Sequence, residues 1–219
     1  MTKTVFALLR EEKQPADTRV AFSPQQCLWL KNKYPDLEII VQPSTHRCYK
    51  DKEYSSEGIS VQEDVSGADW LIGIKEVPPE KLIAGKRYMF FSHTIKKQPH
   101  NQKLLQTVID KNIALVDYEC LVWETGERVL GFGHFAGVVG MHNGFKTYGC
   151  RYKIFDLKPA TQCRDYHELL EQYIGVHLPP IKIAVTGTGR VARGVFAGRS
   201  FRLKNRKLYS NPGPAFCSE

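Results

Sequence analysis

The chain has 219 residues, of which 42% are apolar and 25% are charged, so it is long enough to bury a core in one large or two small domains. Its net charge of +8 comes mostly from the segment after residue 189, where seven Lys and Arg side chains accompany a single acid, which argues against a basic nucleic-acid surface on the body of the chain. There is no apolar run long enough to span a bilayer, no signal segment at the start and no C-x-x-C pair among the six cysteines, which predicts a soluble, cytoplasmic protein without a metal site.

The first part of the chain alternates strand and helix patterns. Ser23 and Pro24 are typical of a helix start, because serine caps a helix and proline suits its first turn. A second helix has an amphipathic pattern from Leu104 to Ile109. The apolar strands span residues 5–9, 38–42, 69–75, 88–92 and 113–117. This pattern predicts an α/β fold, Rossmann- or flavodoxin-like, with a buried parallel sheet whose carboxyl ends form the ligand-binding edge.

The pattern changes near Phe132. Closely spaced small residues over 133–149 predict a long linking helix whose glycines allow close backbone packing. A further helix is expected over 164–174, followed by a strand that leads into Gly187. We therefore expect a substrate domain at 1–138, a linking helix and the beginning of a nucleotide-binding domain at 139–200, and a poorly ordered basic tail at 201–219. Three of the cysteines are expected to be small core side chains: Cys27, Cys120 and Cys150.

A glycine-rich turn follows the last predicted strand. The run Ile183-Ala-Val-Thr-Gly-Thr-Gly-Arg-Val-Ala-Arg-Gly contains a G-x-G-x-x-A sequence, the phosphate-binding turn of a dinucleotide site. Its cofactor-binding residues are Gly187, Gly189, Arg190 and Ala192. Such a site needs an acid about twenty residues later for the ribose, and Lys207 stands there instead.

We expect residues 195–206 not to continue as an amphipathic helix, and we interpret the chain as ending early within its nucleotide-binding domain. The expected consequences are weak nicotinamide-cofactor binding, an inactive isolated chain and self-association through the apolar surface that the missing part leaves exposed.

Polar side chains near the predicted carboxyl ends of the strands are the candidates for chemistry. Lys75 directly follows an apolar strand, so partial desolvation is expected to lower its pKa and suit it to proton transfer. His93 follows the next strand and would complete an acid/base pair. Arg19 precedes a helix and has the forked geometry that binds a carboxylate. Taken singly, each is more typical of an ordinary structural or surface residue, and it is their position at one sheet edge that favours a site.

Five motifs in order resemble the lysine-forming saccharopine dehydrogenases, over about residues 4 to 195. They are R-V-A-x-x-P, I-K-E-x-P, F-F-S-H-T-I-K, D-Y-E and G-x-G-R. Alanine dehydrogenase and the transhydrogenase N-terminal region are more distant relatives. The resemblance implies a substrate domain facing an NAD- or NADP-binding domain, and reversible conversion of saccharopine to lysine and 2-oxoglutarate through an imine.

The resemblance also implies roles for individual residues. Lys75 and His93 would be the acid/base pair. Arg19 and Arg128 would hold substrate carboxylates, and Glu76 and Glu119 would tune the pair or recognise the amino end. The ligands would be a small amino acid and a 2-oxo acid. Three alternatives stay open: an alanine dehydrogenase-like enzyme, a non-catalytic carboxylate-binding module, and an interaction protein that uses the linking helix and the basic tail.

Overall fold

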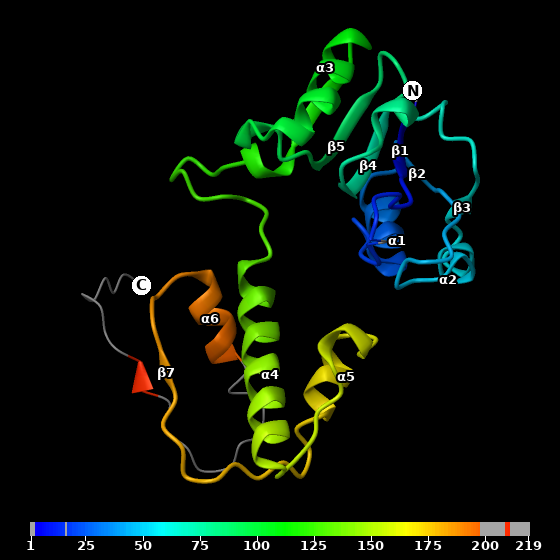
Figure 1. The fold of residues 1–219 in the computed structure, drawn as a ribbon. Helices are drawn as coiled ribbons and strands as arrows, with labels where there is room; N and C mark the ends of the chain where they lie inside the picture. Colours follow the sequence, from blue (N-terminus) through cyan, green and yellow to red (C-terminus); the bar gives the residue numbers. More distant parts are fainter. Residues whose placement is uncertain (1–2, 16, 198–208, 211–219) are drawn as a thin grey trace. The chain divides into compact units, whose positions relative to one another are not determined.

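The computed structural model describes residues 3–15, 17–197 and 209–210 (Figure 1). The chain divides into two compact units, Met1–Leu130 and Gly131–Glu219, which are described separately below. None of the helices among the described residues is long and apolar enough to cross a membrane.

The first unit is built on a six-stranded sheet in which every pairing is parallel. Its strands are β1 (Thr4–Leu8), β2 (Leu37–Val41), β3 (Ser60–Val61), β4 (Trp70–Lys75), β5 (Arg87–Phe91) and β6 (Ala114–Asp117). They lie in the order β3-β2-β1-β4-β5-β6. Strands β1 to β3 extend the sheet in one direction and β4 to β6 extend it in the other, so the strand order reverses between β1 and β4. The predicted α/β fold with a parallel sheet is confirmed. In such sheets ligands bind outside the carboxyl ends of the strands where the order reverses.

Helices connect these strands. The α-helices of this unit are α1 (Pro24–Lys33), α2 (Asp51–Ser56) and α3 (Gln102–Asp110), and its short 3-10 turns are η1 (Pro79–Lys81), η2 (Thr94–Lys96), η3 (Pro99–Asn101) and η4 (Tyr118–Cys120). The predicted start of α1 is confirmed: Ser23 Oγ accepts from the Gln26 N–H at 3.3 Å, and Gln26 Oε1 accepts from the Ser23 N–H at 2.8 Å. Helix α3 buries Leu104 and Val108, as its amphipathic pattern predicts.

Both faces of the sheet are covered. Side chains alternate along a strand, so Leu71 and Tyr88 belong to one apolar cluster whereas Ile72 and Phe91 belong to the other. Burial on both sides explains why these strands have continuous apolar runs instead of an apolar–polar alternation.

The second unit contains the long predicted helix and the glycine-rich turn. Its elements are α4 (Gly133–Tyr152), η5 (Ala160–Gln162), α5 (Tyr166–Glu171), β7 (Ala184–Val185), α6 (Arg190–Ala197) and β8 (Tyr209–Ser210), and β7 pairs with β8 in parallel. Helices α4 and α6 pack backbone to backbone. A Cβ on Gly137 would collide with the Val191 carbonyl oxygen, and a Cβ on Gly194 with that of His134. The predicted close packing of the glycine-rich helix is therefore found against α6.

Some local predictions are wrong. Cys27 is buried as predicted, but Cys120 and Cys150 are exposed. The core face of α4 carries Val138, His142, Phe145 and Gly149, and Cys150 is turned about 100° away from that face. Cys120 ends η4, beyond the sheet.

Two predictions concern the end of the chain. Helix α6 continues through residues 195–197, where we expected no helix, because three apolar or small residues there extend its amphipathic pattern. The remainder of that segment lies outside the described residues. The same holds for the predicted tail at 201–219, except for residues 209 and 210.

Candidate functional site

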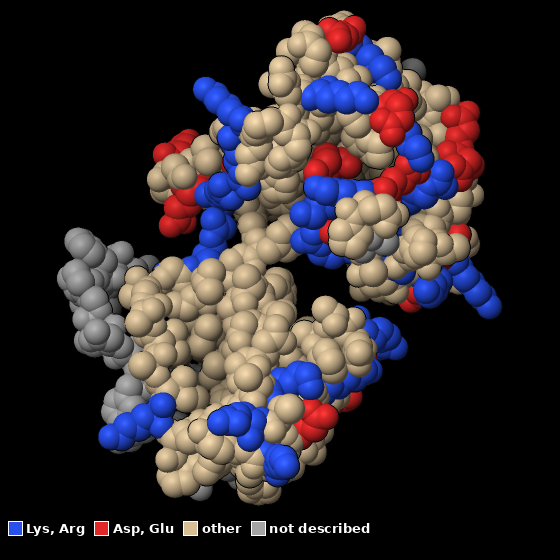
Figure 2. Space-filling view, viewed as in Figure 1, with Lys and Arg blue, Asp and Glu red and all other residues tan. Residues whose placement is uncertain are grey.

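Four neighbouring strands end beside one another and are followed by charged side chains. Arg10, Glu11 and Glu12 follow β1, Lys75 ends β4, His93 follows β5 and Glu119 follows β6. On the visible face of the first unit, Lys and Arg side chains lie among Asp and Glu side chains (Figure 2). This mixture suits a small ligand with charges of both signs better than it suits a polyanion.

Glu11 ties the ends of the two central strands together. Its carboxylate accepts hydrogen bonds from the backbone N–H groups of Ile74, at 2.6 Å, and Lys75, at 2.8 Å. The β4–β5 pairing shifts register between Ile72 and Lys75, and the carboxylate satisfies backbone donors at that irregularity. Burial raises the pKa of Glu11 above its ordinary value, against the lowering effect of the two hydrogen bonds. The sequence analysis missed this residue, although two successive acids after the first strand were a visible signal.

Lys75 and His93, the predicted acid/base residues, lie at the ends of adjacent strands. Lys75 is the half-buried last residue of β4 and is paired with Phe91 of β5. His93 comes two residues later and has a left-handed backbone with φ of +57°. Its ring stacks on Phe91 with 6.3 Å between ring centres.

Glu119 holds the histidine. Its Oε2 lies 2.9 Å from His93 Nδ1, and its Oε1 lies 3.3 Å from both Lys96 Nζ and Arg128 Nη1. The Glu119 side chain is only 4% exposed. Burial alone would raise its pKa, but the bonds to His93 and Lys96 outweigh that effect and hold the pKa below its ordinary value. A carboxylate on Nδ1 fixes the tautomer that leaves Nε2 able to exchange a proton.

Glu119 is itself oriented by the end of β6. Asp117 Oδ1 accepts from the Glu119 N–H at 2.8 Å, and Asp117 Oδ2 accepts from the buried Ser92 hydroxyl at 2.5 Å. The ends of β5 and β6 are thereby connected through side chains, and the histidine and its carboxylate partner stand on a fixed support.

Arg19 binds an aspartate of its own loop. Its Nε and Nη2 donate to the two Asp17 oxygens at 2.9 and 2.5 Å, a forked pair. This bond lowers the pKa of Asp17, and the charge of Lys75 adds a smaller lowering effect.

The two carboxylate oxygens of Glu76 have different surroundings. Its Oε1 pairs with Lys13, whereas its Oε2 is buried and has no hydrogen-bond partner among the described residues. Burial would raise the pKa of Glu76, but the Lys13 ammonium, with a smaller contribution from His93, holds it below the ordinary value. A buried carboxylate oxygen without a donor suits the ammonium group of a ligand.

The glycine-rich turn lies directly before helix α6 and was predicted to bind a phosphate group. Gly187 has φ of +85°, and no atom of the described residues lies within 4 Å of the position that a Cβ would take on Gly187 or Gly189. Helix α6 begins at the next residue, Arg190, and its Ala192 is buried. The open backbone before the helix fits a diphosphate. The ribose partner is not matched, because the sequence has no Asp or Glu between Glu171 and Glu219.

No group of three or more His, Cys, Asp or Glu side chains that could hold a metal ion is present within residues 3–15, 17–197 and 209–210.

The family model described as "Alanine dehydrogenase/PNT, N-terminal domain" matches residues 8–139. The mitochondrial alpha-aminoadipic semialdehyde synthase of Rattus norvegicus is 34% identical over 210 residues, which cover 88% of this chain and 22% of that protein. The Arabidopsis thaliana synthase is 29% identical over 212 residues, covering 87% of this chain and 20% of its own length. This chain thus spans about a fifth of the length of these relatives.

The saccharopine dehydrogenase [NAD(+), L-lysine-forming] of Emericella nidulans is 30% identical over 146 residues, covering 64% of this chain and 38% of that enzyme. Among solved structures, an L-alanine dehydrogenase superposes with a TM-score of 0.63 at 14% identity, over 91% of this chain and 52% of the other. A transhydrogenase from Sinorhizobium meliloti gives 0.61 at 16% identity, over 91% and 56%. These two structures show the shared fold. The rat relative is named as mitochondrial, and the cytoplasmic location stays a prediction.

Proposed function

The chain belongs to the alanine dehydrogenase/PNT N-terminal domain family, and from this membership we propose that its first unit binds substrate and moves protons in an oxidoreductase that interconverts saccharopine with lysine and 2-oxoglutarate. Relatives named for this chemistry support the proposal, as does the set of charged groups at the strand ends. Of these, the His93–Glu119 pair beside Lys75 carries the proposal.

The reaction breaks a carbon–nitrogen bond after oxidation. The secondary amine of saccharopine loses a hydride and a proton to become an imine, and water then adds to the imine carbon and releases lysine and 2-oxoglutarate. A nicotinamide cofactor, when bound, supplies or accepts the hydride. The protein groups have to take the amine proton, deliver protons to the departing nitrogen and position the water.

His93 suits the proton-transfer role. Glu119 accepts from Nδ1, so Nε2 can take a proton from the substrate and return it, and the carboxylate stabilises the imidazolium that forms. Lys75 ends the neighbouring strand and is the second proton carrier. Glu76 Oε2 is the acceptor for the substrate ammonium group.

Two arginines suit the substrate carboxylates. Arg128 and Arg19 each present a planar fork of donors at this edge of the sheet. Each has a carboxylate partner in the structure, Glu119 and Asp17, which holds the guanidinium in place. In the proposed complex, each guanidinium also pairs with a carboxylate of the substrate.

The cofactor would be NAD or NADP. Its diphosphate would meet the backbone of Gly187 and Gly189 and the first turn of α6, where Arg190 adds a positive charge and buried Ala192 keeps the helix close to its neighbours. The printed name of the fungal relatives specifies NAD(+) for those enzymes.

Calorimetric titration of the purified chain with 2-oxoglutarate, lysine and saccharopine tests the substrate proposal. We expect saccharopine and 2-oxoglutarate to bind, and Arg128→Ala to weaken both by about tenfold or more, because a charge-assisted hydrogen bond contributes about 1.5 to 3 kcal/mol. Lys97→Ala, which removes a nearby cation that lies outside the set of site residues, is the matched control and should bind normally. If none of the three compounds bound, the proposal would be contradicted.

Turnover with lysine, 2-oxoglutarate and NADH is measured in the same preparation, and its absence would agree with the expectation that the isolated chain is inactive. Where turnover is detected, a variant tests the role of the histidine. His93→Asn is expected to lower kcat with a smaller change in KM, since the ring acts on protons and the arginines hold the substrate. An unchanged kcat in this variant would remove His93 from the mechanism.

A further inference from the structure

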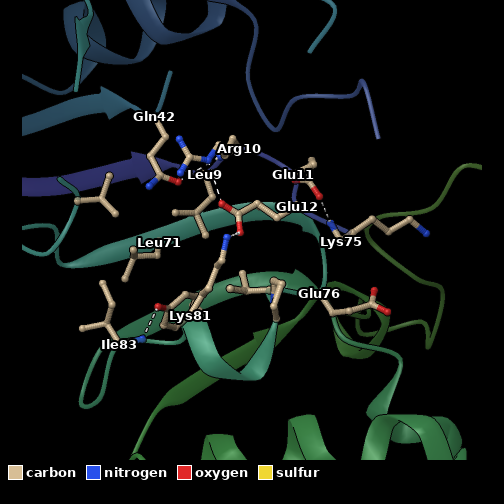
Figure 3. Close-up of a pocket in the computed structure, with 15 residues that line it drawn as sticks. Leu9, Arg10, Glu11, Glu12, Gln42, Leu71, Lys75, Glu76, Lys81 and Ile83 are labelled. Atoms are coloured by element: carbon tan, nitrogen blue, oxygen red, sulfur yellow. Dashed lines mark hydrogen bonds and ion pairs between the residues drawn. The ribbon is translucent and has the colours of Figure 1, made fainter. Parts of the chain in front are cut away.

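The two candidate proton carriers are held in place in different ways. Lys75 is the last residue of β4, and its backbone N–H donates to the Glu11 carboxylate (Figure 3). His93 lies two residues beyond Phe91, where β5 ends. Its position therefore depends on the bonds of the turn that carries it, residues 92–97, which we call the His93 turn.

The His93 turn has an unusual backbone. His93 has φ of +57° and Lys97 has φ of +51°, and the short helix η2 lies between them. This left-handed conformation is costly for residues other than glycine and persists where neighbouring contacts hold it. The His93 carbonyl oxygen is held from two sides, because it accepts from the Lys96 N–H at 3.1 Å and from Asn101 Nδ2 at 3.3 Å.

The residues on either side of His93 bond to each other. Thr94 Oγ1 and Ser92 Oγ lie 2.8 Å apart, and the Thr94 N–H donates to Ser92 Oγ at 3.2 Å. A hydroxyl has one proton to donate, and that of Ser92 goes to Asp117 Oδ2 at 2.5 Å. The Thr94 hydroxyl is therefore the donor to Ser92, and the hydrogen bonds run from Thr94 through Ser92 to Asp117.

These hydrogen bonds lead back to the imidazole. Asp117 Oδ1 accepts from the Glu119 N–H at 2.8 Å, and Glu119 Oε2 lies 2.9 Å from His93 Nδ1. Because His93 is covalently joined to both Ser92 and Thr94, the bonds close a ring that includes its backbone and its side chain. Ser92, Asp117 and Glu119 are buried, which strengthens their hydrogen bonds, and Thr94 is half-buried.

We propose that Thr94 is a positioning residue for His93. Its hydroxyl closes the His93 turn and thereby keeps Nδ1 on Glu119, the arrangement that lets Nε2 exchange a proton. The role belongs to the hydroxyl and not to the bulk of the side chain, so serine should replace threonine and valine should not. The consequence for catalysis rests on the proposed function, whereas the effect on the imidazole does not.

Proton–nitrogen NMR of the purified chain tests the proposal, because it distinguishes the two tautomers of a neutral imidazole. At about pH 8 histidines are ordinarily neutral, and the ring signals of His93 are those that the His93→Asn spectrum lacks. We expect the wild type to carry its ring proton on Nδ1. If Lys96, whose Nζ lies 3.4 Å from Nδ1, donated to that nitrogen instead, the proton would be found on Nε2, which would overturn the proposal.

Thr94→Val keeps the size of the side chain and removes its hydroxyl. The Nδ1 proton of His93 should then exchange with water about fivefold faster, the effect expected from the loss of one neutral hydrogen bond. Thr94→Ser should restore the wild-type rate. Exchange at the wild-type rate in Thr94→Val, or the same fast exchange in Thr94→Ser, would overturn the proposal.

Thr107→Val is the matched control. It removes a threonine hydroxyl of the same unit, one that donates to the Lys103 carbonyl oxygen at 2.8 Å on α3, and it should leave the His93 signals unchanged. Circular dichroism checks the fold of every variant. Thr94→Ala also lacks the hydroxyl and takes the place of Thr94→Val if valine disturbs the fold.

The proposed function is scored separately by calorimetry with 2-oxoglutarate. Binding should weaken in Arg128→Ala and stay unchanged in Thr94→Val, and where turnover is detected Thr94→Val should lower kcat more than it changes KM. Absence of 2-oxoglutarate binding in the wild type would count against the proposed function and leave the NMR result standing. Unaltered His93 signals in Thr94→Val would reject the role of Thr94 and leave the binding result standing.

Discussion

The Glu11 carboxylate at the end of β1 accepts a 2.8 Å hydrogen bond from the backbone N–H of Lys75 at the end of β4. The same carboxylate also accepts from the neighbouring Ile74 N–H. One side chain thus fixes the backbone of the candidate proton carrier from across the sheet.

Replacing Glu11 with Ala is expected to destabilise the first unit by about 2 kcal/mol or more, because each backbone donor left unpaired in a buried position costs about 1 to 3 kcal/mol. Glu11→Gln retains one acceptor oxygen and should cost less. Urea denaturation measures the free energy of unfolding. Glu63→Ala, which removes an exposed acid paired with Arg10, is the control and should change stability by less than about 1 kcal/mol. Equal effects of Glu11→Ala and Glu63→Ala would contradict the assigned role.

The buried Glu119 should make stability depend on acid pH. Its pKa in the folded protein lies below the ordinary value of 4.5. A depressed pKa contributes stability that is fully present above 4.5 and is lost as the pH falls through the folded-state pKa. The difference in unfolding free energy between the wild type and Glu119→Gln should therefore be constant near neutral pH and shrink below about pH 4.5. A difference that stays constant down to pH 3 would show that folding does not lower the pKa of Glu119.

Two glycines of α4 should respond oppositely to alanine. A Cβ on Gly137 would collide with the Val191 carbonyl oxygen of α6, so Gly137→Ala should destabilise the second unit by about 1 to 3 kcal/mol. A Cβ on Gly140 would have no atom of the described residues within 4 Å, so Gly140→Ala should raise stability by about 0.5 to 1 kcal/mol through better helix propensity. Thermal unfolding compares the two. A stabilising Gly137→Ala would rule out the close α4–α6 contact.

The cysteines should differ in reactivity. Burial raises the pKa of Cys27 to about 12, whereas Cys150 is exposed on α4. In the native protein at pH 8, a maleimide reagent should modify Cys150 quickly and leave Cys27 unmodified, and peptide mass spectrometry measures both. Denaturant should make Cys27 reactive. Rapid labelling of Cys27 in the native protein would place it outside the core.

Strand prediction depended on apolar runs and succeeded where those runs were long enough. Segments such as 69–75 and 88–92 correspond to β4 and β5 to within one or two residues. Strand β3 was missed because two residues, Ser60 and Val61, are too few to show a pattern. Helix α2 was missed because only Tyr54 of its six residues is buried, so its sequence has no apolar period.

The candidate site could be predicted only in part, for a related reason. Lys75 and His93 follow apolar strands directly, which marks them in the sequence. Glu11, Asp17 and Lys96 act through side-chain directions that depend on which strands are neighbours, and the order β1-β4-β5-β6 is a property of the whole sheet. Local sequence carries no record of that order.

The left-handed backbone of His93 affects how a substitution library at this position should be interpreted. At φ of +57°, β-branched residues are strained, whereas Asn and Gly are accommodated. A damaging His93→Val change would therefore combine a folding defect with the loss of the imidazole. His93→Asn removes the ring but keeps a residue type that tolerates this backbone conformation. This variant therefore measures the chemical role of the imidazole without adding backbone strain.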